Sequence, residues 1–358
     1  MKNKKLSINI IGKVPPPIGG VTIHTLRLYQ WLKKEKDINV KLTALNKHNI
    51  DDENIKYSGN FIIWVFKKLL FGFKEDIVHY QGSNYTGLLL LSIIKKLHPN
   101  FNFVWSIHSE YLINKIKDKK LFVFSINQIN NIIADNINIK NQLILEKYKS
   151  DNISIISPFL MPENYNKNTD NLLDIYKNNN KVILFNAYKL VFNDKKEDVY
   201  GLDTLLKAFQ NINDKNNILI LLIPSINNEE KEYYNNLINN INLELQKNII
   251  LISDVKTDGW KYINSCDIFI RPTITDGDAL SVKEALYMDK ITIVSDCTTR
   301  PDGVVLFRSS SSGDLTIKLN EIVNDDVKEH VNLNKEDNIK KFINLYIKLK
   351  ENNENTIS

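Results

Sequence analysis

The sequence predicts an α/β protein built from two Rossmann-like, doubly wound domains that face a cleft. Short runs of apolar, β-branched residues alternate with longer segments of helical periodicity. These runs are apolar on both faces, as in the buried strands of a parallel sheet. The alternation stops at the polar, Asn-rich stretch 158–181 and then starts again. The length of 358 residues suits two domains of ordinary size.

The first expected domain covers residues 1–160 and contains six strands separated by five helices. The strands are expected at 7–11, 40–45, 76–80, 103–107, 132–134 and 153–157. The helices are expected at 21–34, 62–71, 86–97, 119–130 and 140–148. This order predicts a parallel sheet with helices on both faces.

A linker at 161–180 is expected to lead into the second domain, residues 181–335. Its strands are expected at 182–186, 218–223, 249–253, 267–271, 291–295 and 304–307. Its helices are expected at 202–211, 229–245, 258–263, 280–287 and 314–323. A last helix is expected at 335–350, and the C-terminal segment 336–358 could pack back on the first domain.

Composition and charge narrow the classes of partner. The formal charge of +5 and the pI of about 8.8 are too evenly spread to indicate nucleic acid, and they suit an anionic ligand or an anionic membrane surface. Cys266 and Cys297 lie in apolar runs and are expected to be buried, reduced thiols. The sequence has no signal-peptide pattern and no apolar run of membrane-spanning length. We therefore expect a cytoplasmic protein, which could be peripheral on the inner face of the membrane.

The stretch 271–286, RPTITDGDALSVKEAL, is the strongest candidate for a binding site. It leaves an apolar strand, and Asp278 is expected as the N-cap of the following helix. Ala279, Leu280 and Ser281 would then form the first helical turn. The unpaired backbone N–H groups of such a turn and the positive end of the helix dipole bind phosphate.

Two carboxylates flank that turn. Glu284 is expected beside Ser281 on the helix, where it could reach ribose hydroxyls. Asp276 lies on the preceding loop, where it could reach a sugar hydroxyl. A capped helix with a solvated glutamate explains the same spacing without any ligand, and spacing alone favours that plainer interpretation.

Two loops of the first domain also follow predicted strands. Gly19 and Gly20 open a helix and would let a ligand approach the backbone, although a loop made of turn residues explains them as well. His24, on the same helix, could equally be a surface histidine. His108 stands just past a buried strand, which is a cleft position in a doubly wound domain; a hydrogen-bonded histidine at a strand end is an equal explanation.

Lysines follow the first strand of the second domain. Lys189, Lys195 and Lys196 precede the helix at 202–211. Cations at the carboxyl end of a strand can hold a diphosphate as it leaves. For at least one of Lys195 and Lys196, a solvated surface charge is the better interpretation.

Two helical segments of the first domain combine apolar and aromatic residues with lysine pairs. They are NFIIWVFKKLLFGFKEDIV, with Lys67 and Lys68, and LLLLSIIKKLHPNF, with Lys95 and Lys96. Such helices can lie on an anionic membrane surface. Core helices with basic outer faces explain the pattern slightly better.

Together these features resemble the retaining GT-B glycosyltransferases, the glycosyl transferases group 1 superfamily, over most of the chain. The likeness is strongest at INIIGKVPPPIGGVTIHTLRL and DIFIRPTITDGDALSVKEALYMDKITIVSD. The E-x7-E motif of that superfamily is matched by Asp276 and Glu284, with aspartate in the first place. Its Gly-Gly loop is matched by Gly19 and Gly20, and its mid-domain histidine by His108.

The sequence departs from the family pattern at two positions. Lys189 stands where the family usually has an arginine, and a lysine cannot make a bidentate contact. The usual Lys-Gly pair is missing, because Tyr200 precedes Gly201 in YGLDTLLKAF. Lys195 or Lys196 would have to reach over from the same loop.

The resemblance implies a nucleotide-sugar donor, most simply a UDP- or GDP-sugar, held mainly by the second domain. It implies that Glu284 binds the ribose, that Asp276 contacts the donor sugar, and that Lys189 with Lys195 or Lys196 neutralises the diphosphate. The acceptor, a glycan or a lipid-linked oligosaccharide, would lie against the first domain. The anomeric configuration of the sugar would be retained.

The resemblance further implies that Gly20 approaches the phosphate and that His108 contacts the donor sugar near the reacting centre, without metal or other cofactor. The expected function is a hexosyltransferase in the synthesis of a bacterial surface polysaccharide such as capsule or O-antigen. Three alternatives stay open. Asp276 and Asp278 could form a D-x-D metal site, as in single-domain, metal-dependent glycosyltransferases. The chain could be a non-hydrolysing nucleotide-sugar epimerase, or a non-catalytic GT-B-like partner subunit.

Overall fold

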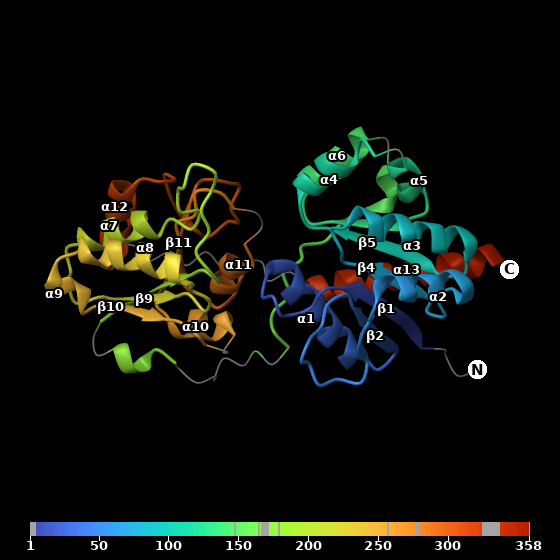
Figure 1. Ribbon diagram of the computed structural model, residues 1–358, viewed down its shortest axis with the longest axis horizontal. Coiled ribbons are helices and arrows are strands. Elements are labelled where there is room, and N and C mark those ends of the chain that lie inside the picture. Colours follow the sequence, from blue (N-terminus) through green and yellow to red (C-terminus); the bar gives the residue numbers. More distant parts are fainter. Residues whose placement is uncertain are drawn as a thin grey trace. The chain divides into compact units, whose positions relative to one another are not determined.

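The computed structural model describes residues 5–119, 121–146, 148–163, 165, 172–177, 180–255, 258–276, 279–323 and 337–357. The chain divides into two compact units, each drawn in Figure 1. The first unit consists of residues 1–164 together with the C-terminal segment 336–358, and the second consists of residues 165–335. The described part of the expected linker holds a short 3-10 helix, η2 (Asp174–Tyr176).

In the described part of the first unit, parallel strands form a seven-stranded sheet in the order β3-β2-β1-β4-β5-β6-β7. The strands are β1 (Leu6–Gly12), β2 (Ile38–Ala44), β3 (Ile55–Tyr57), β4 (Ile77–Tyr80), β5 (Asn102–Ile107), β6 (Asn131–Ala134) and β7 (Ile153–Ile155). Every residue of β4, β5 and β6 is buried, as the apolar runs predicted for a sheet covered on both faces.

Helices cover the two faces of this sheet and form two cores. One core contains Trp105 and Phe101 and is covered by α2 (Phe61–Phe71), α3 (Tyr85–Leu97), α4 (Glu110–Ile116), α5 (Phe122–Asn127) and α6 (Ile137–Leu145). The other core is covered by α1 (Gly20–Lys34), which contributes Tyr29, and by α13 (Asn338–Ile357), which contributes Phe342 and Tyr346. The last helix of the chain, red in Figure 1, therefore packs on the sheet of the first unit.

In the described part of the second unit, six parallel strands form a sheet in the order β10-β9-β8-β11-β12-β13. They are β8 (Val182–Asn186), β9 (Ile218–Leu222), β10 (Ile249–Ile252), β11 (Ile268–Arg271), β12 (Ile291–Ser295) and β13 (Val305–Phe307). The helices are α7 (Leu202–Gln210), α8 (Asn228–Asn239), α9 (Leu243–Gln246), α10 (Gly259–Ser265), α11 (Leu280–Tyr287) and α12 (Ser312–Val323). The two-domain, doubly wound α/β architecture expected from the sequence is confirmed.

Asparagine starts helices throughout the chain, which gives the Asn-rich composition a structural use. The side chains of Asn60, Asn84, Asn136, Asn227 and Asn242 each accept a hydrogen bond from a backbone N–H in the first turn of the following helix. Such caps satisfy donors that the helix itself leaves unpaired.

The structure corrects the expected element bounds at several places. β3 and α4 were not predicted, because three and seven residues are too short to show a clear periodicity. The single helix expected at 229–245 is instead α8 and α9, since α8 ends at Asn239 and Asn242 caps a new helix. The helix expected at 119–130 is limited to α5.

The two thiols have different surroundings. Cys266 is buried as expected, and burial raises the pKa of its thiol to about 12. Cys297 is only half-buried, and the expectation of apolar surroundings is wrong for it. Its Sγ lies 3.3 Å from Ser295 Oγ and 3.4 Å from Arg300 Nη2, because Cys297 stands past the end of β12, among the polar groups of the following loop.

Within the ranges described above, no helix has both the length and the apolar composition needed to span a bilayer.

Candidate functional site

The strand order reverses once in each sheet, between β1 and β4 in the first unit and between β8 and β11 in the second. Loops that leave the two strands at such a point diverge, and ligands of doubly wound sheets bind at the carboxyl ends of those strands. The loop after β1 carries Gly19 and Gly20, the loop after β8 carries Lys189, and the loop after β11 carries Asp276. The topology therefore brings these predicted residues to the switch point of their own unit.

A network of buried charges occupies the switch point of the second unit. Arg271, the last residue of β11, binds Asp276 through two hydrogen bonds, Nε to Oδ2 at 2.6 Å and Nη2 to Oδ1 at 3.0 Å. Arg300, from the loop after β12, donates Nη1 to Asp276 Oδ2 at 2.9 Å. The side chains of Asp276 and Arg300 are 8% and 3% exposed. Two cations and one anion are thus fixed together in the loops that follow neighbouring strands.

These contacts occupy the carboxylate of Asp276. Thr273 Oγ1 donates a fourth hydrogen bond, at 3.3 Å, and a carboxylate has about four lone-pair positions. Burial alone would raise the pKa of Asp276, but the hydrogen bonds and charges of Arg271 and Arg300 outweigh it and hold the pKa below its usual value. A direct contact with a donor sugar would require the carboxylate to exchange one of these partners.

Reasoning from the sequence missed Arg271 and Arg300. A signal was present for the first, because Arg271 is a charged residue at the very end of a predicted apolar strand. The pairing of Arg300 with a residue 24 positions earlier leaves no local pattern in the sequence.

The helix after this loop has the expected bounds, but Ala279 stands before its first turn. α11 starts at Leu280, so Ala279 is the N-cap, and no side chain of that residue caps the helix. Ser281 is the second helical residue. Glu284 lies on the buried face of α11, with 6% of its surface exposed. The prediction that Asp278 is the N-cap falls on a residue outside the described ranges.

The three predicted lysines are exposed, at different distances along the chain from the switch point. Lys189 stands in the bend directly after β8. Lys195 and Lys196 stand further along the same loop, at the tip of its turn, where Asn193 Oδ1 accepts the N–H of Lys195 at 2.9 Å. Lys196 has a φ of 60°, a left-handed conformation that belongs to this turn. Of the three, Lys189 is nearest in sequence to the strand end.

The base of the lysine loop is joined to the loop that follows β11. Ile274 N donates to Val199 O at 3.0 Å, and the guanidinium carbon of Arg271 lies 5.5 Å from the centre of the Tyr200 ring. Gly201 has a φ of 71°, and a Cβ there would collide with the carbonyl of Pro272. The loops after β8 and β11 therefore form one packed structure, and it needs glycine at position 201.

In the first unit, Gly19 is the N-cap of α1 and donates its backbone N–H to Thr22 Oγ1 at 3.0 Å. Gly20 is exposed, and a Cβ built there would meet nothing within 4 Å. No internal packing therefore requires glycine at position 20. An open approach to the backbone is what a ligand at this helix end would use.

His108 lies just past β5 and pairs with a carboxylate from the next strand. Its Nδ1 is 2.9 Å from Oδ2 of Asp135, which follows β6, and its Nε2 is 2.7 Å from Oε1 of Gln81, which follows β4. The His108 side chain is 14% exposed and that of Asp135 is 4% exposed. Three adjacent parallel strands thus end in three residues that hold one another.

The buried histidine His79 contacts the same glutamine. Burial lowers the pKa of His79 to about 3, so the ring is neutral. Its Nε2 is 3.1 Å from Gln81 Nε2, an amide nitrogen that can only donate, and its Nδ1 is 2.7 Å from Tyr346 Oη. With the amide of Gln81 assigned in this orientation, its oxygen faces His108 and accepts. Asp135 and Gln81 then place hydrogen-bond acceptors at the two ring nitrogens of His108.

His24 belongs to the same cluster, and the suggestion that it is a surface histidine is wrong. It is 1% exposed, and its ring centre lies 5.3 Å from that of His108 in an edge-to-face arrangement. Its Nδ1 is 2.6 Å from Pro158 O. Burial is the main reason that the pKa of His24 is held well below its usual value. The burial of His24 could not be predicted from the sequence, because it results from the packing of α1 against the sheet at the carboxyl ends of the strands.

Comparisons with known proteins identify a family pattern in the second half of the chain. Residues 177–341 match the family model of glycosyl transferases group 1. An uncharacterised glycosyltransferase of Methanocaldococcus jannaschii is 26% identical over 331 residues, which cover 84% of this chain and 77% of that protein.

Solved structures share the fold over nearly the whole chain. Anabaena HepE in complex with UDP has a TM-score of 0.65 at 12% identity, over 98% of this chain and 99% of that one. The UDP-GlcNAc 2-epimerase of Methanocaldococcus jannaschii has a TM-score of 0.63 at 16% identity, over 96% of this chain and 100% of that one. The chain therefore has the two-domain GT-B fold, and its residues 177–341 carry the sequence pattern of the glycosyl transferases group 1.

Proposed function

We propose that this protein is a retaining glycosyltransferase that transfers a hexosyl group from a nucleotide-sugar donor to a glycan acceptor. The observation that carries the proposal is the match of residues 177–341 to the glycosyl transferases group 1, in the unit whose switch point holds the buried cations. HepE was crystallised with UDP and with UDP-glucose, which favours a UDP-sugar over a GDP-sugar as donor. Retention of configuration rests on the resemblance alone.

The positive charge at the switch point of the second unit suits a leaving nucleoside diphosphate. The reaction builds negative charge on that group, so fixed cations lower the barrier. We assign this role to Arg271 and Lys189, which stand at the ends of β11 and β8, with Lys195 or Lys196 approaching from the loop tip. The start of α11, with the N-cap Ala279 and the helical residues Leu280 and Ser281, and Asp278 before it in the sequence, would receive the phosphates. Glu284 would bind the ribose.

Asp276 acts in this proposal by holding Arg271 in place. The contacts of Asp276 also count against the D-x-D metal site. Two guanidinium groups lie within 3.0 Å of the Asp276 oxygens and would repel a divalent cation. Transfer should therefore proceed in excess EDTA. An obligatory requirement for Mg²⁺ or Mn²⁺ would contradict this assignment.

The first unit would contribute Gly20 to the approach of the donor phosphate and His108 to the donor sugar. His108 is partly exposed, and a sugar hydroxyl could replace Gln81 as the acceptor of its Nε2 proton. Asp135 holds the His108 ring through the hydrogen bond at Nδ1. The acceptor would lie against this unit.

A thermal-shift panel of UDP-, GDP-, ADP- and CDP-sugars tests the donor class. A ligand at 100 times its Kd stabilises the native state by about 2.7 kcal/mol. Glu284→Gln should abolish the shift with the dominant donor, and Glu229→Gln, an exposed glutamate at the start of α8, should leave it unchanged. If no nucleotide sugar shifts the transition, or if both variants respond alike, the proposed donor site is refuted.

An epimerase is the second candidate, because the M. jannaschii UDP-GlcNAc 2-epimerase shares the fold at a TM-score of 0.63. The two reactions differ without any acceptor. An epimerase converts the free nucleotide sugar into its epimer, whereas a transferase leaves the donor unchanged or slowly hydrolysed. Nuclear magnetic resonance of the donor after incubation separates them. If neither reaction occurs and Glu284→Gln has no effect on glycan synthesis in cells, the chain acts as a non-catalytic partner subunit.

We also propose that the protein works in bacterial surface polysaccharide synthesis, on the cytoplasmic face of the membrane. α2 supports this placement, because only Val65 of this helix is buried. Large apolar side chains project from α2, with Ile62, Phe66 and Phe71 exposed by 77%, 60% and 75%. An exposed apolar helix face beside lysines is typical of binding to anionic lipid.

The lysines of this surface divide into two pairs. Lys67 and Lys96 are exposed. Lys68 Nζ lies 4.5 Å from the centre of the Phe73 ring, and Lys95 donates to the carbonyl of Phe101, so these two are turned inward. Burial lowers the pKa of Lys95 to about 8. Lipid contact should therefore depend on Lys67 and Lys96.

Sedimentation with vesicles tests the membrane proposal. Binding to phosphatidylglycerol vesicles should exceed binding to phosphatidylcholine vesicles and weaken with salt. Phe66→Glu should abolish it, while Leu243→Glu, a change at an apolar residue of the second unit that is 76% exposed, should not. Equal binding of the two variants would refute the role of α2.

A further inference from the structure

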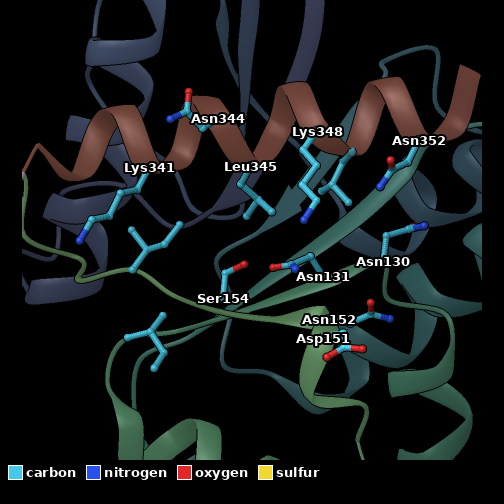
Figure 2. Close-up of a pocket in the computed structure, with 13 residues that line it drawn as sticks. Asn130, Asn131, Asp151, Asn152, Ser154, Lys341, Asn344, Leu345, Lys348 and Asn352 are labelled. Atoms are coloured by element: carbon cyan, nitrogen blue, oxygen red, sulfur yellow. The ribbon is translucent and has the colours of Figure 1, made fainter.

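The first unit carries a polar pocket on the flank of its sheet. The pocket has a volume of about 580 Å³ and lies between α13 and the strands β6 and β7 (Figure 2). Asn131, which lines it, is the first residue of β6, whereas Asp135 follows the last residue of that strand. At about 3.3 Å per residue, the pocket floor at Asn131 is roughly 13 Å from the His108–Asp135 pair. The pocket is therefore separate from the switch-point site.

The helix α13, which lines the pocket, runs along the sheet from the carboxyl ends of the strands toward their amino ends. Asn338, the first residue of α13, donates Nδ2 to Phe159 O at 3.0 Å, beyond the carboxyl end of β7. Near the other end, Leu349 O accepts from Asn102 Nδ2 at 3.0 Å, at the start of β5. α13 thus runs from the carboxyl edge of the sheet to its amino edge. An extended ligand with one end at the carboxyl ends of the strands could continue along this helix.

Two polar groups in the pocket have no partner among the residues that the structure describes. Asn131 is 5% exposed, and its buried Oδ1 has no hydrogen-bond partner in the described part of the chain. An Asn amide can be assigned either way round, so this position needs either a donor or an acceptor. A hydroxyl group supplies both.

The second group is the ammonium of Lys348. Figure 2 shows Lys348 reaching from α13 into the pocket, and no carboxylate among the described residues pairs with it. Lys341 lies two helical turns away on the same side, about 10 Å along the axis at 1.5 Å per residue. The opposite wall offers Asn152, Ser154 and one acid, Asp151. The ammonium of Lys348, which has no described carboxylate partner, favours a ligand that carries negative charge as well as hydroxyl groups.

We propose that this pocket binds an acidic oligosaccharide, as the part of the glycan acceptor that is remote from its reacting end. This inference rests on the proposed glycosyltransferase function for the identity of the ligand. The hydroxyl groups of the sugar satisfy Asn131 and the neighbouring amides, and a carboxylate of the sugar pairs with Lys348. The position of the pocket along α13 leaves the reacting end of the acceptor free to reach the carboxyl edge of the sheet.

Isothermal titration of the full chain with trigalacturonate and with the neutral maltotriose tests the proposal. Trigalacturonate should bind at least tenfold more tightly, and its affinity should fall as salt is raised. Lys348→Ala should weaken binding at least tenfold. Lys340→Ala removes the same charge from the same helix, at an exposed residue paired with Asp337, and should change the affinity less than twofold.

The donor-induced thermal shift, measured on the same variants, separates this inference from the proposed function. It should be unchanged in Lys348→Ala. A donor shift without any trigalacturonate binding would overturn the pocket assignment and leave the transferase proposal standing. Maltotriose binding as tightly as trigalacturonate, or equal losses in the two lysine variants, would also overturn it.

Discussion

Replacing Asp276 by asparagine should loosen the loop between β11 and α11 and leave the first unit unchanged. The carboxylate receives three hydrogen bonds from Arg271 and Arg300, at 2.6, 3.0 and 2.9 Å. Removing one partner of a buried ion pair costs about 3–5 kcal/mol. Asparagine keeps one acceptor oxygen and the Arg271 side chain is 15% exposed, so we expect the lower end, about 3 kcal/mol.

Hydrogen exchange followed by mass spectrometry measures this loss where it occurs. At about 1.4 kcal/mol per factor of ten, amides of β11 and α11 that exchange through unfolding should exchange roughly 100-fold faster. Peptides from the first unit serve as an internal reference. Asp194→Asn is the matched control, because Asp194 is exposed and makes no ion pair with any described residue. Protection in Asp276→Asn within a factor of two of the control would refute this account of the network.

The pH dependence of the same variant has a definite sign. The pKa of Asp276 is lowered in the folded state, so its stabilisation is present above the unfolded value of about 3.9. It is lost as pH falls through the lower, folded pKa. Wild type and Asp276→Asn should therefore differ at neutral pH and converge in acid. A difference that grows on acidification would contradict the assignment.

Three further outcomes are expected. Asp135→Asn should lower kcat for sugar transfer by roughly 10- to 100-fold, because His108 loses a charged hydrogen-bond partner; an unchanged kcat would rule out a role for Asp135 in positioning His108. Gly201→Ala should destabilise the chain by more than about 2 kcal/mol in urea unfolding, since φ is 71° there and a Cβ collides with backbone. The control Gly313→Ala in α12, where a Cβ meets nothing within 4 Å, should not lower the free energy of unfolding. Burial raises the pKa of Asp198 to about 6, so the free energy of unfolding should fall by about 2–3 kcal/mol as pH rises from 4 to 6; Asp198→Asn should remove that slope, and its persistence would assign it to another group.

The sequence predicted the regular elements well because the signal for them is local. A strand buried on both faces is an unbroken apolar run, and a covering helix shows a period of 3.6, so both can be recognised within ten residues or so. β8, α11 and β12 have the bounds expected for them. Elements of three to seven residues, such as β3 and α4, carry too few repeats of either pattern.

The candidate site was predicted at the level of loops and only partly at the level of contacts. Placing Lys189 and Asp276 after strands was enough to bring them to a carboxyl edge, because all strands of a parallel sheet end on the same side. Which side chain pairs with Asp276 could not be predicted in this way. A carboxylate that binds a ligand and a carboxylate that pairs with a buried arginine are the same residue type with the same spacing. The sequence pattern therefore does not distinguish the two roles.

By itself, the amino-acid sequence determined two doubly wound sheets, the loops that leave them and the chemistry available in those loops. Only the tertiary structure decided that Arg271 and Arg300 enclose Asp276, and that Tyr346 of the last helix reaches His79 beneath His108. The physical reason is that periodicity arises within one element, whereas a buried charge finds its partner through strand order and burial, which join residues far apart in the chain.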